Sequence, residues 1–160
     1  NAATIRMSAL SPVGRSPLIE ASGALTPTPD GGRRAELTLS GDAFDIAHYK
    51  ALWPDDPGNT ARSWMAERMS AGLITNLHGE FALALPPDGP PTLEKADAYF
   101  DVAGLSLIAK PGLSPLVELA GRGRIDGLSL DIAVSGGRQN GVAITGGNVT
   151  FPDFAADPVG

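Results

Sequence analysis

Hydrophobic and polar residues alternate along much of this chain with the two-residue period of β-strands. The clearest case is Leu128 to Val134, where every second residue is Leu, Ile or Val and the residues between them are mostly Ser and Asp. Residues 73–85 behave similarly, with apolar side chains on one parity and Asn76, His78 and Glu80 on the other. A strand with this period has one apolar face and one wet face. The pattern therefore predicts a sheet that is apolar on one side.

The alternation slips by one residue at two places. Residues 98–102 carry their apolar side chains on one parity and residues 105–107 on the other, with Ala103-Gly104 between them. The same slip separates residues 142–144 from residues 149–151, at Gly146-Gly147. One extra residue restores the face of a strand, and glycine in a strand favours a bend. Both sites are predicted to bulge or bend, which favours a strongly curved sheet.

Glycine and proline divide the chain into segments of strand length. The 20 Gly and 14 Pro cluster at short intervals, for example over 27–32, 86–91 and 111–115. Such spacing is typical of antiparallel sheets joined by hairpins. Weaker alternation predicts further strands, over 5–9, 19–25, 35–39 and 117–125.

Two segments show helical spacing instead. The first runs from Asp42, a plausible N-cap, to Trp53, and Pro54 would end it. The second runs from Thr60 to Ala71 and carries an apolar face, and a glycine would then supply the left-handed stop. The apolar face consists of Ala61, Trp64, Met65 and Met69, and it could partly fill the concave side of a curved sheet. The glycine that would stop the helix is Gly72.

Composition excludes several classes of function. The net charge of −6 argues against a nucleic-acid partner, whose phosphates require Lys and Arg. It also argues against binding of anionic lipid head groups by a polybasic segment. No apolar run approaches the roughly 18 residues of a membrane-spanning helix. The absence of Cys excludes disulfides and thiolate metal sites.

No constellation of residues indicates catalysis, so we predict a protein that is not an enzyme and has no metal or cofactor. His48 and His78 are too few and too far apart for a zinc site. Asp55-Asp56 lies in a Pro-Gly turn, where Asp is a common turn residue. Two weaker candidates remain. The first is a set of carboxylates that could face one another, namely Glu94, Asp97 and Asp101. The second is the basic pair Arg122 and Arg124, which would contact a lipid phosphate or pair with Asp126 or Glu118.

Several short motifs resemble those of AsmA-like envelope proteins of Gram-negative bacteria, of the YhdP type. The most specific part is Leu52-Trp53-Pro54 followed by Ala61-Arg62-Ser63-Trp64. The resemblance covers residues 41–151 and includes four further runs, Ser70-Ala71-Gly72-Leu73-Ile74, Lys110-Pro111-Gly112-Leu113-Ser114-Pro115-Leu116, Ala120-Gly121-Arg122-Gly123-Arg124 and Ile144-Thr145-Gly146-Gly147-Asn148-Val149.

This resemblance implies a segment of a larger periplasmic protein, held at the inner membrane by an N-terminal anchor outside this chain. It implies stacked β units that form a hydrophobic groove for phospholipid transport between the inner and outer membranes. The partners would be phospholipid acyl chains and neighbouring β units of the same chain. Residues 1–41 would end a preceding β unit, residues 42–72 would be a helical insertion, and residues 73–151 would form the main curved sheet.

We therefore expect a mostly β fold: a strongly curved, groove-like antiparallel sheet with one or two short helices. The alternative is a closed β-sandwich that binds a glycan or protein ligand, in which the same apolar residues are only core. For the groove, the expected lipid-binding residues are those on the apolar parity of the later strands: Leu77, Phe81, Leu83, Leu85, Phe100, Val102, Leu128, Leu130, Ile132, Val134, Val142 and Ile144.

Overall fold

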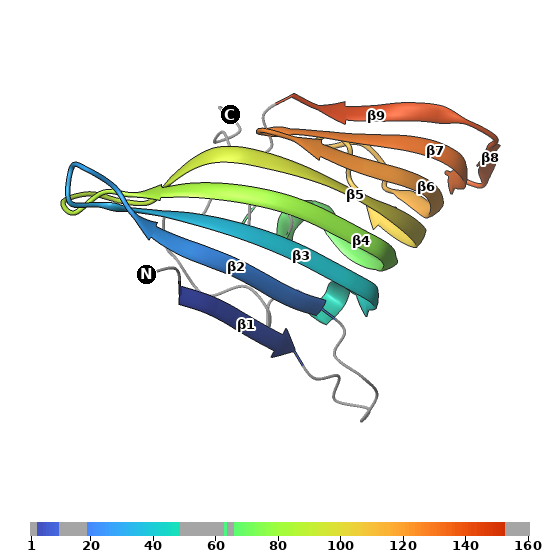
Figure 1. The fold of residues 1–160 in the computed structure, drawn as a ribbon. Coiled ribbons are helices and arrows are strands. Elements are labelled where there is room, and N and C mark those ends of the chain that lie inside the picture. The colour runs from blue at the N-terminus through green and yellow to red at the C-terminus, as the bar shows by residue number, and fades with distance from the viewer. Residues whose placement is uncertain (1–2, 10–18, 49–62, 64–65, 153–160) are drawn as a thin grey trace.

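The described strands form one open antiparallel sheet (Figure 1). The computed structural model describes residues 3–9, 19–48, 63 and 66–152, with the backbone alone for residues 3–9 and 48. Its elements are β1 (Ala3–Ala9), β2 (Ile19–Pro27), β3 (Arg33–Asp45), the 3-10 helix η1 (Ile46–His48), β4 (Met69–Leu85), β5 (Thr92–Leu107), β6 (Leu116–Asp126), β7 (Ser129–Gln139), β8 (Val142–Ile144) and β9 (Gly147–Phe151).

Strands that are neighbours in sequence are neighbours in the sheet from β1 to β8, and β9 pairs with β7. The sheet curves, and it does not close, since β1 and β9 do not pair with each other (Figure 1). The predicted fold class, a curved antiparallel sheet with little helix, is confirmed. The closed sandwich is not what the described strands form, because all of them belong to a single sheet.

The buried core lies on one face of β4 to β7. The side chains of Leu107, Leu119 and Ile132 are fully buried, and Leu105 is 1% exposed. Around them pack the other members of the cluster, namely Ile46, Met69, Ile74, Phe100, Val102, Leu130 and Val134. The core is therefore aliphatic, with one aromatic ring.

The bulge expected in β5 is present. The register between β5 and β6 shifts between Val102 and Leu105, and Gly104 takes a φ of +64°. Val102 and Leu105 are both buried although they differ in parity. The extra residue thus returns the apolar side chains of β5 to the same face.

The second expected slip is a break between two strands. Residues 145–146 separate β8 from β9, and both strands pair with β7. Both strands keep the same register with β7, since Val134 pairs with Gly147 and Gly137 pairs with Ile144. The sheet is therefore interrupted at the predicted bend.

Both predicted helices are wrong where they adjoin strands. Asp42–Asp45 ends β3, and η1 supplies only residues 46–48 of the first helix. Residues 66–68 are helical, but Met69–Ala71 already belong to β4. Pairing of β3 with β4, which joins Asp45 to Leu73, outweighs the local helical pattern. Residues 49–62, 64 and 65 lie outside the described residues, as do the predicted Trp53 and Trp64.

Two single-residue predictions are corrected as well. Gly72 does not stop a helix but lies in β4 with a φ of +140°, and a Cβ added there would be 2.8 Å from the Cα of Leu105. Its role is close contact between β4 and β5. Leu128 is not in a strand but in the turn before β7, and it is 45% exposed.

Candidate functional site

One face of the sheet is apolar across almost its whole width. Paired residues in antiparallel strands carry their side chains on the same face. From β2 to β9 one row of such partners contains no charged or polar side chain, and it consists of Ala21, Leu39, Gly79, Ala98, Ile125, Leu130 and Phe151. We call the side that carries this row the apolar face and its opposite the polar face.

The structure brings most of the predicted lipid-binding residues onto the apolar face, but with different exposure. Leu77 and Ile144 are partly buried against the core cluster, whereas Leu128 and Val142 are 45% and 68% exposed. Three more are half-buried, and they are Phe81, Leu83 and Leu85. The remaining five belong to the buried core itself, and they are Phe100, Val102, Leu130, Ile132 and Val134.

Exposure on the apolar face therefore falls from β4 towards β7. Phe81 pairs with Leu37 of β3, and both side chains are half-buried. Leu83 pairs with Leu93 of β5, which is 43% exposed. Ile132 of β7, in contrast, is completely buried. The accessible apolar surface lies near the β2–β3 and β4–β5 hairpins.

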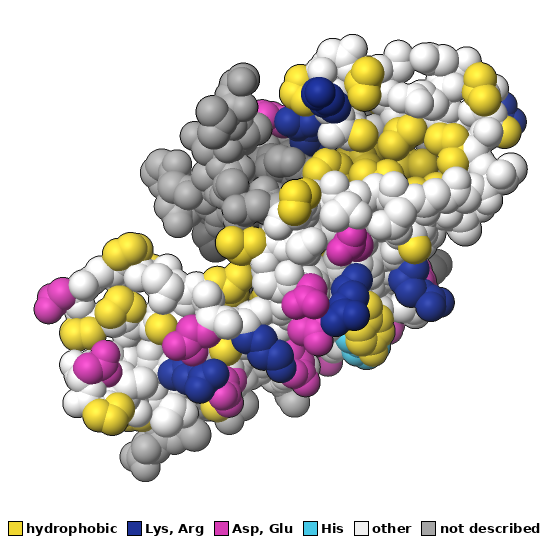
Figure 2. Space-filling view, turned by 90° about the horizontal axis from the view of Figure 1, so that it is seen from above, with side chains coloured by type: hydrophobic (Ala, Val, Ile, Leu, Met, Phe, Trp, Pro, Cys, Tyr) yellow, Lys and Arg dark blue, Asp and Glu magenta, His cyan; other side chains and the backbone are white. Residues whose placement is uncertain are grey.

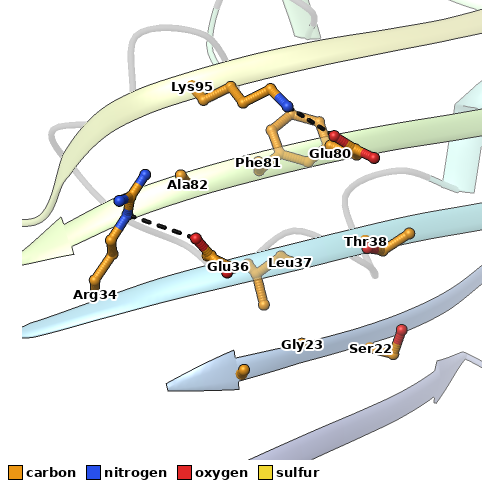
Figure 3. A pocket seen from close by; sticks show the side chains of 11 residues that line it. Ser22, Gly23, Arg34, Glu36, Leu37, Thr38, Glu80, Phe81, Ala82 and Lys95 are labelled. Atoms are coloured by element: carbon orange, nitrogen blue, oxygen red, sulfur yellow. Dashed lines mark hydrogen bonds and ion pairs between the residues drawn. The ribbon is translucent and has the colours of Figure 1, made fainter. Parts of the chain in front are cut away.

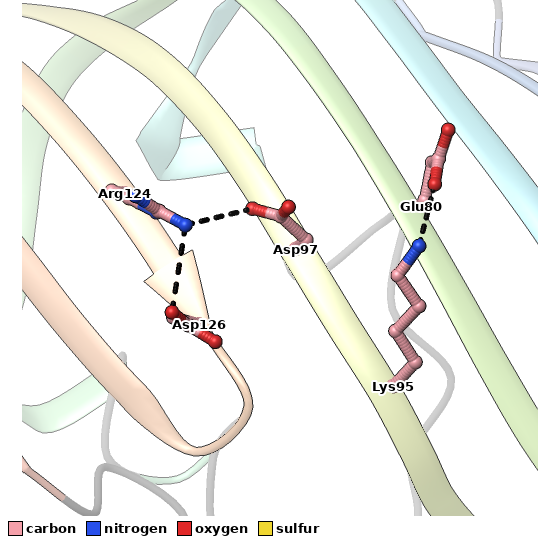
Figure 4. A network of polar contacts seen from close by, with 5 residues as sticks. All are labelled: Glu80, Lys95, Asp97, Arg124 and Asp126. Carbon is pink, nitrogen blue, oxygen red and sulfur yellow. Dashed lines mark hydrogen bonds and ion pairs between the residues drawn. The ribbon is translucent and has the colours of Figure 1, made fainter.

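The polar face carries ion pairs that join neighbouring strands. Lys95 donates a hydrogen bond of 2.7 Å to Glu80, and Arg124 lies 3.8 Å from Asp97 and 3.5 Å from Asp126 (Figure 4). Figure 2 shows most of the acidic and basic side chains of this view in one band, with a patch of hydrophobic side chains beyond it. The charges of these pairs thus lie on the side opposite the buried core.

The Lys95–Glu80 pair is set to remain charged at neutral pH. The hydrogen bond from Lys95, and then the attraction of its charge, lower the pKa of Glu80. The same two causes raise the pKa of Lys95. Each shift favours the ionised form, so neither group is tuned to exchange protons near neutral pH.

Two shallow pockets occur on the described part of the sheet. The larger, of about 540 Å³, spans β2 to β5, and Figure 3 shows Arg34 and Glu36 on one side of it and Lys95 and Glu80 on the other. The smaller, of about 370 Å³, is lined by four residues of the polar face, namely Asn76, Tyr99, Asp101 and Arg122. We call the smaller one the Tyr99 pocket.

The carboxylates considered for catalysis are each engaged by a separate arginine. Glu94 lies 3.0 Å from Arg34, and Asp101 lies 3.4 Å from Arg122. Arg122 and Arg124 lie on the polar face, where Arg122 contacts Asp101 and Arg124 contacts Asp126, one of the partners that the sequence left open. Asp55-Asp56 lies outside the described residues, as does the side chain of His48.

Two further findings concern the described residues alone. They contain no group of three or more His, Asp or Glu side chains that could hold a metal ion. They also contain no helix long and apolar enough to cross a membrane.

The Tyr99 pocket was missed by the sequence reasoning. The alternation of Ala98, Tyr99 and Phe100 would place the Tyr ring opposite two apolar neighbours, which is a usable signal. The pairing of Asp101 with Arg122, in contrast, depends on the register between β5 and β6.

Comparison of the chain with protein-family models, curated proteins and solved structures found no match.

Proposed function

We propose that this chain is a non-catalytic module whose apolar face contacts the acyl chains of phospholipids. In this proposal it forms part of the hydrophobic groove of an AsmA-like periplasmic protein that carries phospholipid between the inner and outer membranes. The main support is the seven-strand row of uncharged side chains on a sheet that stays open. The resemblance of its motifs to that family is the second support.

The energetics of an acyl chain explain why such a face suits transport. Each CH₂ group exposed to water costs about 0.8 kcal/mol. An apolar face that shields the chain removes much of this cost along the route. The head group can stay in solvent, so the function requires no specific set of polar ligands.

The gradient of exposure narrows the proposed contact region. Leu37, Phe81 and Leu83 are half-buried; Leu37 pairs with Phe81, and Leu83 lies two residues further along the same strand of the β3–β4 ladder. Ile132 and Leu130 are 0% and 5% exposed, so a lipid would reach them only if their cover moved. We therefore assign acyl-chain contact first to the β3–β4 part of the apolar face and treat the β5–β7 part as core.

The wider context belongs to the same proposal. Neighbouring β units of the same chain would adjoin this sheet, and an N-terminal anchor would hold the full protein at the inner membrane. The module itself would contribute one section of the groove.

Site-specific photocrosslinking tests the proposal with a control in the same strand. Leu37 and Thr38 are adjacent in β3 and point to opposite faces. A benzophenone amino acid at position 37 should crosslink to phosphatidylethanolamine from vesicles, whereas the same group at position 38 should not. Equal crosslinking at both positions, or none at position 37, would overturn the proposal.

A further inference from the structure

We propose that the Tyr99 pocket on the polar face is a saccharide-binding site. It lies opposite the face assigned above to lipid, and it involves none of the residues of that proposal. A pyranose ring would stack on Tyr99, and its hydroxyl groups would bond to Asp101, Asn76 and Arg122. The inference goes beyond the proposed function and can fail independently of it.

Tyr99 offers an unusually accessible ring for a strand residue. Its neighbours Ala98 and Phe100 are 1% and 9% exposed on the apolar face, whereas Tyr99 is 55% exposed. His78 of β4, its partner in the ladder, lies with its ring centroid 5.2 Å away and its plane tilted by 31°. This contact restricts the orientation of the Tyr ring and leaves more than half of the residue open. A held, open aromatic ring is a stacking platform for the apolar C–H face of a sugar.

The polar groups of the pocket are also held in place before any ligand binds. The Asn76 side-chain amide donates a hydrogen bond of 2.7 Å to one carboxylate oxygen of Asp101, and Arg122 Nε donates at 3.4 Å to the other. These bonds, that from Asn76 foremost, hold the pKa of Asp101 below its usual range. The carboxylate is therefore a fixed acceptor at neutral pH. The Arg122 side chain is 78% exposed and can donate to a ligand.

This combination fits a neutral sugar better than an anion or an apolar peptide. A sugar ring presents apolar C–H groups on one side and alternating donors and acceptors at its edge, which suits one aromatic ring beside a carboxylate, an amide and a guanidinium. A free anion would meet the charge of Asp101 next to that of Arg122. The volume of about 370 Å³ lies in the range of small-molecule sites.

A glycan array with the 160-residue chain, followed by saturation-transfer NMR with chitobiose and maltose as probes, tests the inference. We expect binding of at least one neutral saccharide, with saturation transferred from the protein to the C–H protons of the sugar ring. Tyr99→Ala should weaken it by about tenfold or more, the loss of one stacking contact. Leu113→Ala is the control, because Leu113 is 54% exposed but does not line the pocket, and it should leave affinity unchanged.

The variant Asp101→Asn keeps the shape of the side chain and should also reduce affinity, which guards against a folding defect in Tyr99→Ala. The proposal is overturned if no neutral saccharide binds, or if Tyr99→Ala binds as well as the wild type. It is equally overturned if inorganic phosphate displaces the sugar at equal concentration, since the pocket would then be an anion site at Arg122.

Discussion

The ring of Phe100 lies over the backbone of Gly123, its partner on the neighbouring strand. Phe100 is on β5 and Gly123 on β6, and a Cβ at position 123 would collide with the edge of the ring. Gly123 is itself buried. Glycine in a strand packs poorly by itself, and a cross-strand aromatic ring can cover the gap. The pair thus allows the apolar face to stay tightly packed where the sheet curves.

Gly123→Ala should therefore destabilise the protein. The added methyl group must displace the Phe100 ring, and overpacking of this kind costs about 1–3 kcal/mol. The midpoint of urea unfolding measures the loss. Gly136→Ala is the matched control, because a Cβ at that position in β7 meets nothing within 4 Å. A Gly123→Ala variant as stable as the control would show that the ring does not depend on the glycine.

The core itself gives a second prediction, which separates two residues that sequence parity treats alike. Ile132 is completely buried, whereas Leu128 is 45% exposed in a turn. Ile132→Ala should cost about 2–5 kcal/mol, since it removes buried methyl groups and leaves a cavity. Leu128→Ala should change the free energy of unfolding by less than about 0.5 kcal/mol. Thermal or urea unfolding of both variants checks this, and similar losses would place Leu128 in the core.

Much of the fold could be predicted from the sequence, because parity along a strand reports which side chains share a face. The slip in parity between Val102 and Leu105 predicts the bulge, since both side chains must reach one core. The helix expected from Asp42 failed for the opposite reason. Its spacing is a local signal, and the ladder that pairs Asp45 with Leu73 is a long-range one.

The candidate sites could be predicted only in part. Sequence parity places Phe81 and Ile132 on one face. It cannot tell that Phe81 is half-buried and Ile132 completely buried, because the burial of a side chain depends on the packing of segments distant in sequence. On the polar face the chemistry depends on which strands adjoin. The contact of Asp101 with both Asn76 of β4 and Arg122 of β6 exists only in the observed register.

The bulge in β5 gives a third prediction. Gly104 has a φ of +64°, and a Cβ added there would meet nothing within 4 Å, so backbone conformation alone decides the cost of a substitution. Gly104→Ala should destabilise by about 1–2 kcal/mol, because L-residues resist the left-handed region. Gly104→Asn should cost less, since Asn tolerates that region better. Urea unfolding of both variants measures the difference, and equal stability of wild type and Gly104→Ala would contradict the assigned bulge.

The ionisation of Asp101 gives the last prediction. The hydrogen bond from Asn76 is the foremost cause that lowers the pKa of Asp101, and Arg122 contributes less. Asn76 has a φ of +52°, so Asn76→Gly removes the amide without straining the backbone. The pKa of Asp101 should rise towards its ordinary value in this variant, and carbon-detected NMR titration of the side-chain carboxyl measures it.

The sign of the linked effect on stability follows from the direction of the shift. A carboxyl whose pKa is lower in the folded state stabilises the fold above its unfolded pKa, and this contribution is lost as the pH falls through the folded pKa. The wild type should therefore lose its advantage over Asn76→Gly as the solution becomes acidic. Glu80 is the internal control, because Lys95 lowers its pKa and Asn76 does not. A pKa of Asp101 that stays low in Asn76→Gly would show that Arg122 alone holds the carboxylate.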